Sequence, residues 1–339
     1  MLISLRHLQG TALVTGAAGF IGSSLCKRLL AEGLRVRALD DLSSGAKENV
    51  AALMNQESFH FVLADVRDAQ VVGDLLNGSD LVFHLAANPE VRAGLGDSNI
   101  DFERNILGTR VLLEAIRSIA WRGTLVFSST STVYGDATTI PTPEDYGPLI
   151  PISMYAATKL GCEALITAYS TLVGFDAMIL RFANVIGPHS RRGVIHDLVK
   201  KLQHDPARLE VLGDGTQMKS YIYIDDCIEA SIHALRYAEL RRPVVYNVGT
   251  TDQTEVKTIV EIVIKEMGLK GVRVGFRPER DGRGWPGDVK SMLLDVTRLQ
   301  GLGWSARHSS AQAVRRTIRE VVHGAGATSP PSSSDNLSG

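Results

Sequence analysis

The sequence has few cysteines and no sign of a metal site. Its 339 residues include three cysteines, which are widely separated. An odd number of scattered thiols cannot form a disulfide framework, so we expect buried thiols in a reducing compartment. The nine histidines show no metal-ligand spacing and no CxxC pair occurs, which argues against a bound metal. The cysteines are Cys26, Cys162 and Cys227.

An excess of one charge and a long apolar run are also missing. The 36 Lys and Arg are balanced by 37 Asp and Glu, without the basic excess of a nucleic-acid binder. No apolar run reaches the roughly 18 residues that cross a bilayer, and Met1–Gly10 lacks the apolar core of a signal peptide. We therefore expect a cytoplasmic protein with no nucleic-acid or membrane partner. Its length suits two domains, or one large α/β domain with a lobe attached.

Short apolar runs alternate with helical patterns in the first part of the chain. Such alternation is typical of a parallel sheet covered by helices. The predicted strands are Thr11–Thr15, Leu34–Leu39, Phe59–Leu63, Leu81–His84, Thr124–Phe127 and Asp176–Leu180. The predicted helices are Ile21–Glu32, Ile100–Ile119 and Ala156–Val173.

The pattern loosens after Gly187-Pro188, where a second and smaller lobe is predicted. We expect a first domain over residues 1–187, a lobe over residues 188–324, and a return of the chain to the first domain near residues 220–250. Residues 325–339 are rich in Ser and Pro and are expected to form a disordered tail. The elements predicted after residue 188 are helices over Val194–Leu202 and Thr254–Met267, and strands over Leu209–Leu212, Tyr221–Ile224 and Tyr246–Val248.

Three glycines in the motif GAAGFIG lie between the first predicted strand and the first predicted helix. Gly16 permits a tight turn, Gly19 lets the backbone approach a pyrophosphate, and Gly22 allows close packing of helix and strand. Asp40 ends the second strand, where a carboxylate binds the ribose and repels a 2′-phosphate. The pattern predicts NAD rather than NADP. The alternative is a turn without a ligand, in which Asp40-Asp41 are ordinary turn residues.

Two further strands are predicted to end at the carboxyl edge of the sheet, where the glycine loop also lies. Asp65-Val66 follow the third strand and could meet the adenine, or could be a solvated strand end. The fourth strand ends in the motif HLAA, where Ala86 and Ala87 leave room for a cofactor to pass. His84 in this motif is interpreted as a hydrogen-bonded core histidine and not as a catalyst.

Tyr155 and Lys159 in the motif YAATK lie four residues apart, on one face of a predicted helix. A tyrosine pKa of about 10 must fall by roughly 3 units, about 4 kcal/mol, for a phenolate near neutral pH. A neighbouring ammonium and the positive nicotinamide of NAD⁺ both favour the phenolate. The hydroxyl-rich segment Ser128–Thr132 directly follows a strand, so Thr130 could bind the substrate or the tyrosine oxygen. The alternative is an amphipathic helix with a surface Tyr and Lys.

These motifs occur in the order found in the extended short-chain dehydrogenases/reductases. TGAAGFIG, LDDLSSG, HLAA, SSTSTVYG, YAATK and RFANVIGP are followed by GDGTQMKSYIYIDD, YNVG and GWPGDV. Within that superfamily the chain resembles nucleotide-sugar 4-epimerases of the UDP-glucose 4-epimerase type. The resemblance implies a Rossmann-type doubly wound parallel sheet with a smaller C-terminal substrate-binding lobe. It also implies a homodimer formed through the two long helices near residues 100 and 156.

The resemblance assigns roles to individual residues. Tyr155 would be the catalytic base, Lys159 would bind the nicotinamide ribose and lower the tyrosine pKa, and Thr130 would stand beside the tyrosine. The other implied cofactor-binding residues are Gly16, Gly19, Phe20, Ile21, Gly22, Asp40, Asp41, Ser43, Ser44, Gly45, Asp65, Val66, Leu85, Ala86, Ala87, Asn105 and Ser128. The implied substrate-binding residues are Asn184, Val194, Ile195, Val211, Lys219, Tyr221 and Asp288.

Two positions depart from the family pattern. Lys219 stands where the family usually has an arginine. Lysine keeps the positive charge but cannot form the bidentate hydrogen bonds of a guanidinium with a phosphate. Trp285 stands where some epimerases have an arginine, and Arg280 or Arg283 could replace that charge.

The residues after Thr130 bear on the reaction. The 4,6-dehydratases of the family carry Asp-Glu there, whereas this chain has Ser131-Thr132. We therefore expect NAD-dependent 4-epimerisation of a UDP-hexose of the UDP-glucose/UDP-galactose type, through a 4-keto intermediate. Alternatives are a UDP-N-acetylhexosamine or UDP-glucuronate, whose carboxylate Arg191 and Arg192 could bind, although these arginines could equally be solvated. Another nucleotide-sugar oxidoreductase or dehydratase, or a non-catalytic NAD-binding protein, is also possible in principle.

Overall fold

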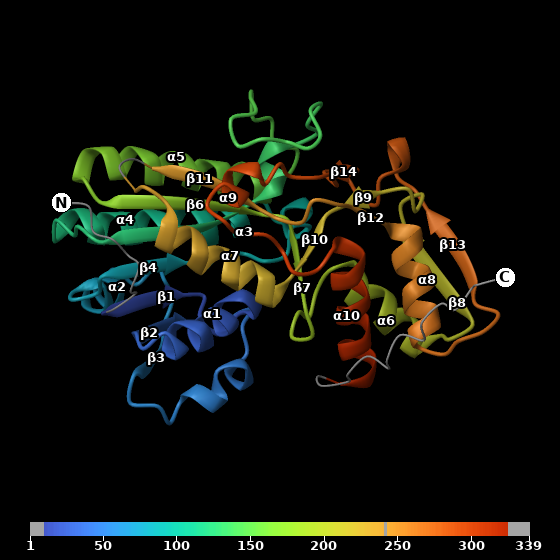
Figure 1. The fold of residues 1–339 in the computed structure, drawn as a ribbon, viewed down its shortest axis with the longest axis horizontal. Helices are drawn as coiled ribbons and strands as arrows, with labels where there is room; N and C mark the ends of the chain where they lie inside the picture. The colour runs from blue at the N-terminus through green and yellow to red at the C-terminus, as the bar shows by residue number, and fades with distance from the viewer. Residues whose placement is uncertain (1–9, 241–242, 325–339) are drawn as a thin grey trace.

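A seven-stranded parallel sheet forms the core of the larger part of the molecule (Figure 1). The computed structural model describes residues 10–240 and 243–324, so the tail predicted over residues 325–339 lies outside the described residues. The strand order is β11-β6-β5-β4-β1-β2-β3. From β1 the chain adds β2 and β3 on one side of the sheet, and then β4, β5, β6 and β11 on the other side. The predicted Rossmann-type α/β fold is thereby confirmed. The strands are β1 (Thr11–Thr15), β2 (Arg35–Asp40), β3 (Phe59–Leu63), β4 (Leu81–His84), β5 (Thr124–Thr130), β6 (Asp176–Phe182) and β11 (Val244–Val248).

Helices cover both faces of this sheet. In β1, Ala12 and Val14 belong to one buried cluster and Leu13 to another, because successive strand residues point to opposite faces. Helices α1 and α7 pack together over the first cluster, and α2, α4 and α5 contribute to the second. These helices are α1 (Phe20–Ala31), α2 (Ala69–Leu76), α4 (Gly108–Ser118), α5 (Met154–Val173) and α7 (Ile224–Tyr237).

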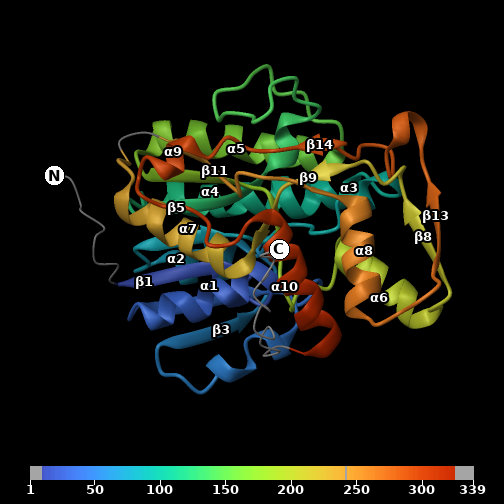
Figure 2. The same ribbon diagram turned by 45° about the vertical axis from the view of Figure 1, so that its right-hand side comes forward.

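A smaller lobe lies beyond one edge of the sheet (Figures 1 and 2). Three of its helices contact one another, and the parallel strands β8 and β13 complete it. Its main elements are α6 (Val194–His204), β8 (Arg208–Leu212), α8 (Val256–Glu266), β13 (Arg273–Arg277) and α10 (Ser310–His323). Two small sheets lie among the connecting segments, made of β7 (Asn184–Ile186) with β10 (Tyr221–Tyr223), and of β9 (Met218–Lys219), β12 (Thr254–Glu255) and β14 (Ser291–Met292).

Short helical segments occupy several connections. They are η1 (Lys47–Asn49), η2 (Ala51–Leu53), η3 (Ala93–Leu95), α3 (Asn99–Asp101), η4 (Phe102–Leu107), η5 (Ser131–Tyr134), η6 (Arg280–Gly282) and α9 (Thr297–Gln300). Between the lobe elements the chain crosses back to the larger domain through α7 and β11, and β11 pairs with β6 at the sheet edge.

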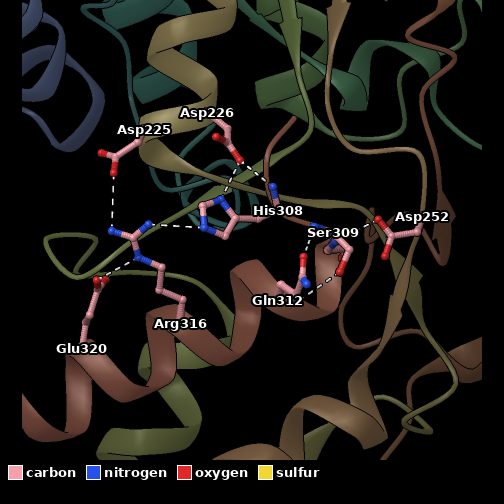
Figure 3. A network of polar contacts seen from close by, with 9 residues as sticks. Asp225, Asp226, Asp252, His308, Ser309, Gln312, Arg316 and Glu320 are labelled. Carbon is pink, nitrogen blue, oxygen red and sulfur yellow. Dashed lines mark hydrogen bonds and ion pairs between the residues drawn. The ribbon is translucent and has the colours of Figure 1, made fainter. Parts of the chain in front are cut away.

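The start of α10 is joined to α7 by a polar network (Figure 3), and Tyr223 of β10 contacts the same helix. His308 Nδ1 lies 2.8 Å from a carboxylate oxygen of Asp226, which is buried. Arg316 stacks 3.9 Å above the ring of Tyr223 and donates a hydrogen bond of 3.1 Å to Glu320. The Tyr223 hydroxyl donates to the same Glu320 at 2.7 Å. These contacts hold the last lobe helix against the larger domain.

Several predicted boundaries were wrong. Strand β5 continues past Phe127 to Thr130, so Ser128, Ser129 and Thr130 are strand residues. The helix predicted over Ile100–Ile119 is interrupted by the π-helical segment η4, a feature that is frequent at functional sites. The strand predicted over Tyr221–Ile224 ends one residue earlier, because Ile224 begins α7.

The helix predicted from Thr254 begins instead at Val256. Thr254 and Glu255 form β12, which pairs antiparallel with β9. Helices α7 and α10 were not predicted at all, although both have an apolar face. Strand β12 depends on its tertiary pairing with β9, which local periodicity does not show, whereas the apolar faces of α7 and α10 are a local signal that was missed.

Candidate active site

A large cavity lies between the two parts of the molecule, at the carboxyl ends of the sheet strands. Its volume is about 1120 Å³, and its walls come from the glycine loop, the ends of β2, β4 and β5, the start of α5, and the lobe. Every predicted catalytic, cofactor-binding and substrate-binding residue lines it, except Asn105. Ligands of doubly wound sheets bind at this edge, near the reversal of strand order.

The glycine loop is shaped so that a phosphate can approach the backbone. Gly16 has φ 69°, and a Cβ at this position would lie 2.8 Å from the backbone nitrogen of Ala86. A Cβ on Gly22 would lie 2.1 Å from the Gly16 carbonyl oxygen, so both positions require glycine. Helix α1 has no side-chain cap at Gly19, which leaves its first N–H groups available for an anion.

Asp40 lies at the end of β2 beside the glycine loop. Its carboxylate accepts hydrogen bonds from the backbone of Ala18 at 2.9 Å and of Leu42 at 2.8 Å. Burial raises the pKa of Asp40, and the backbone donors oppose that rise. The carboxylate is therefore held in a fixed orientation on the cavity wall, where a ribose hydroxyl could donate to it.

Asp65 is engaged by an arginine that the sequence analysis did not single out. Arg67 donates to the Asp65 carboxylate at 2.7 Å through its guanidinium and at 2.8 Å through its backbone. These bonds lower the pKa of Asp65. Arg67 also lies 3.1 Å from Glu103, and both Asp65 and Arg67 line the cavity. The only sequence signal for Arg67 is its place two residues after Asp65.

Lys159 is buried in the wall of the cavity, next to β5. Its ammonium donates to the Ser128 carbonyl oxygen at 2.7 Å and lies 4.6 Å from the centre of the Phe127 ring. Burial lowers the pKa of Lys159 to about 8. The ammonium is therefore charged at neutral pH and close to the point where it would lose its proton.

Tyr155 lies one helical turn before Lys159 and lines the same cavity. Burial, with a contribution from Asp101, raises the pKa of Tyr155 above its ordinary value. The protein without cofactor and substrate therefore favours the neutral phenol. A cation that enters the cavity would lower this pKa, in the sense that base catalysis needs.

Thr130 ends β5 and caps the short segment η5. Its Oγ1 accepts a hydrogen bond of 3.2 Å from the Thr132 backbone and lies 3.0 Å from the Thr132 hydroxyl. The strand thus delivers a hydroxyl to the cavity wall that Tyr155 also lines.

Asn105 braces the site from behind. Its side-chain oxygen accepts from the Asn88 backbone at 2.8 Å, and its nitrogen donates to Thr158 at 2.9 Å. The structure thus places Asn105 on η4, facing α5 and outside the cavity wall, and brings Asn88 to the wall instead. His84 is buried between Thr15 and Thr109, at 2.7 and 3.0 Å, and burial lowers its pKa to about 3.

The lobe supplies a mixed set of charges to the cavity. Lys219 forms an ion pair with the buried Asp288. Arg283 is bound to Asp136 at 2.8 Å and to the Asp288 carbonyl at 2.6 Å. Neither Arg283 nor Arg280 lines the cavity, so neither replaces the cavity charge that is missing at Trp285. Further basic residues that line it are Arg92, Arg104, Arg191, Arg192 and Lys200.

The described residues contain neither a metal centre nor a membrane span. Among residues 10–240 and 243–324, no group of His, Cys, Asp and Glu side chains is arranged to hold a metal ion. Within the same residues, no helix is both long and apolar enough to span a bilayer.

Known proteins resemble this chain over most of its length. The family model described as the NAD dependent epimerase/dehydratase family matches residues 12–249. UDP-glucose 4-epimerase of Mycolicibacterium smegmatis is 36% identical over 312 residues, which cover 90% of this chain and 96% of that protein. This chain belongs to the NAD-dependent epimerase/dehydratase family.

Solved structures of similar proteins agree with this assignment. The crystal structure of a UDP-galactose 4-epimerase has a TM-score of 0.81 at 38% identity and covers 92% of this chain and 99% of that one. UDP-glucuronic acid 4-epimerase from Bacillus cereus, solved with UDP-glucuronic acid and NAD, has a TM-score of 0.83 at 32% identity, with coverage of 92% and 99%. The chain is thus an NAD-dependent nucleotide-sugar epimerase of this family.

The predicted cofactor, NAD, is confirmed by the family and by structures of relatives that contain it. The residues on the cavity wall fit it. Glycine at positions 16 and 22 permits the tight backbone packing that brings the uncapped start of α1 to the cavity, and Asp40 stands where a ribose hydroxyl would be bound. A carboxylate at Asp40 disfavours the 2′-phosphate of NADP.

Proposed function

We propose that the protein interconverts UDP-glucose and UDP-galactose by epimerisation at C4 of the sugar. The observation that carries this proposal is the convergence of Thr130, Tyr155 and Lys159 on the wall of the same cavity as the NAD cradle. The relatives named UDP-glucose 4-epimerase support the choice of sugar.

The residues of the chain have separate tasks in this reaction. NAD, held by the glycine loop and Asp40, would supply the acceptor for the hydride at C4 of the sugar and would serve as its donor afterwards. Tyr155 takes the proton of the C4 hydroxyl as the hydride leaves, and donates it back when the hydride returns. Lys159 keeps its positive charge near Tyr155 and so favours the phenolate. Thr130 orients the C4 oxygen between these groups.

The segment after Thr130 favours epimerisation over dehydration. Ser131 is buried, and Thr132 is hydrogen-bonded to Thr130. Neither side chain can serve as the acid or base that would remove a proton at C5 and water from C6. The 4-keto sugar can therefore turn in the site and receive the hydride on its other face.

UDP-glucuronate is the second candidate substrate. Arg191 and Arg192 are exposed side chains on the cavity wall, in the loop before α6. Either guanidinium could bind a carboxylate at C6. The relative from Thermodesulfobacterium geofontis, which is 30% identical, carries the name UDP-glucuronate 4-epimerase.

Proton NMR of separate incubations decides between the candidates. Purified protein is mixed with UDP-glucose, UDP-N-acetylglucosamine or UDP-glucuronate, without added NAD. We expect UDP-galactose to form from UDP-glucose. Conversion of UDP-glucuronate alone, abolished in Arg191→Ala/Arg192→Ala, would instead support the second candidate. No conversion of any of the three, even with added NAD, would contradict the proposed function.

We also propose that the lobe binds the nucleotide sugar and that the protein is cytoplasmic.

We further propose that the protein forms a homodimer through α4 and α5. Leu112 and Ile116 of α4 are fully buried within the chain and cannot take part in such an interface. Leu160 and Leu165 of α5 are partly buried, which leaves them available. Light scattering at two protein concentrations would measure the oligomeric state.

A further inference from the structure

Glu163 and Arg181 form a buried ion pair behind the strand that carries Thr130. Arg181 Nη2 lies 2.7 Å from one carboxylate oxygen of Glu163, and Nε lies 3.0 Å from the other. Each residue is 5% exposed. A buried ion pair adds little to stability over an apolar pair of the same volume. Its presence beside a catalytic strand therefore calls for a functional explanation.

The pair connects α5 to β5 at the level of the catalytic groups. The Ser129 hydroxyl donates to the Glu163 carboxylate, and Ser129 pairs with Arg181 in the register of β5 and β6. Ser129 lies between Ser128, whose carbonyl binds Lys159, and Thr130. Glu163 follows Lys159 by one helical turn. Helix α5 thus holds two consecutive residues of β5, which sets the position of the catalytic helix against the catalytic strand.

The other side of Arg181 holds the segments that follow Thr130. Its Nη1 donates to the Glu144 carbonyl at 3.1 Å, and its guanidinium lies 4.8 Å from the centre of the Tyr134 ring. The Tyr134 hydroxyl donates to Asn247 at 2.7 Å. Arg181 therefore fixes η5 and its neighbours as well as α5.

The charge of the pair matters because Lys159 is buried one helical turn before Glu163, and Tyr155 lies one further turn toward the start of α5. As a neutral pair, Glu163 and Arg181 add almost no net field. Burial lowers the pKa of Lys159, and Cys162 and the Glu163 carboxylate both raise it and partly offset the effect of burial. The other titratable groups around this region are Cys162 on α5, Asp101 on α3, His84 on β4, Tyr134 on η5 and Glu144, with Arg298 of α9 beside Glu144.

We propose that Glu163 and Arg181 are positioning residues for the reaction, which hold Lys159 and Thr130 in place and keep the charge around Lys159 balanced. This inference rests on the roles proposed above for Tyr155 and Lys159. Neither Glu163 nor Arg181 touches the substrate. Both act through Ser129, the β5 backbone and α5.

Single variants separate this role from a merely structural one. Glu163→Gln leaves the Arg181 guanidinium unpaired, and arginine stays protonated in proteins. Its charge favours the phenolate of Tyr155 and the neutral amine of Lys159. Both limbs of the pH profile of kcat should therefore move to lower pH, by about one unit. Arg181→Met leaves a buried carboxylate and should move both limbs to higher pH until that carboxylate takes up a proton.

The double variant Glu163→Gln/Arg181→Met tests the positioning role alone. It carries no unpaired charge, so its pH limbs should return to the wild-type values. Because the contacts to Ser129 and Glu144 are altered, kcat should stay about tenfold low with KM nearly unchanged. Glu229→Gln is a control for the loss of one carboxylate from an ion pair, because the part-exposed Glu229 of α7 lies 2.7 Å from Arg28 of α1 and Arg28 keeps a second partner in Glu32. The control should shift neither kcat nor the pH limbs.

A second readout does not need an active epimerase. Tyrosinate absorbance of the NAD-loaded protein, minus that of the Tyr155→Phe variant, reports the ionisation of Tyr155 directly. In Glu163→Gln the midpoint should fall, and in the double variant it should return. Failure of the wild type to epimerise any sugar would contradict the proposed function and leave this titration decisive. Unshifted midpoints in Glu163→Gln, or a double variant with wild-type kcat, would overturn the inference; if Glu163→Gln does not fold, the double variant decides.

Discussion

The cofactor side of the cavity and the lobe side are built by different means. On the cofactor side, one continuous segment from β1 to the end of β2 shapes the cradle, with Gly16 in the turn after β1, Gly22 in α1 and Asp40 in β2. On the lobe side, Lys219 meets Asp288 across 69 residues of sequence, and α10 supplies Thr317 to the wall. A site made of local backbone can be recognised in a sequence. A site made of distant side chains needs the folded chain.

The catalytic groups Tyr155 and Lys159 are also close in sequence, one helical turn apart on α5. The largest expected effect concerns them. Tyr155→Phe removes only the phenol oxygen from the cavity wall. We expect kcat to fall by about a thousandfold, since general acid–base groups contribute roughly 10²–10⁴-fold. Bound NAD, measured by absorbance after denaturation, should be unchanged. A kcat within threefold of the wild type would remove Tyr155 as the base.

Asp40 tests the cofactor side through binding. Asp40→Ala should weaken NAD binding by about 10–100-fold, since a hydrogen bond to a charged group is worth about 1.5–3 kcal/mol. Asp74→Ala is the control, because the exposed Asp74 on α2 accepts from the Gln70 side chain at 3.0 Å and lies outside the cavity wall. Fluorescence titration of the protein freed of NAD measures both affinities. Equal losses in the two variants would contradict the role of Asp40.

Lys159 makes the reaction sensitive to alkaline pH. Burial lowers its pKa to about 8. The side chain is therefore fully protonated well below pH 8, and it loses its positive charge as the pH rises through that value. Its support for the Tyr155 phenolate disappears with the charge. We expect kcat to fall about tenfold between pH 7 and pH 9, following a single proton with this pKa. A profile that stays flat to pH 9.5 would contradict this account of Lys159.

Lys219 tests the lobe side, where the smallest effect is expected. Lys219→Met removes one positive charge from the wall and leaves Asp288 to repel a diphosphate. The KM for the nucleotide sugar should rise about fivefold, with kcat within twofold, because a partly exposed ion pair contributes about 1 kcal/mol. Lys290→Met is the control, since Lys290 pairs with Asp214 at 3.0 Å outside the cavity wall. Equal KM values for both variants would show that Lys219 does not bind the substrate.

The parallel sheet and the NAD loop could be predicted because they depend on local signals. The strand Thr11–Thr15, the glycines after it and Asp40 lie within one βαβ unit, whose periodicity and turn residues are visible in the sequence. The helix carrying Tyr155 and Lys159 was predicted for the same reason. Its start at Met154 depends on the cap at Ser153.

Other features depend on contacts that the sequence does not show. Asn105 faces Asn88 and Thr158 and not the cavity, because η4 widens the helix by a π-helical turn. Arg283 was a candidate for the missing charge at Trp285, but Asp136 binds it. The conformation of a loop from residue 280 to 288 is set by tertiary partners, which no local pattern reveals.

The central claim is that a hydride leaves C4 of the sugar and returns to the same carbon within one closed site. UDP-glucose labelled with deuterium at C4 tests it most directly. We predict UDP-galactose that keeps the deuterium at C4, with no label in the solvent and none in added free NADH. Loss of the deuterium to water, or its appearance in free NADH, would contradict the account.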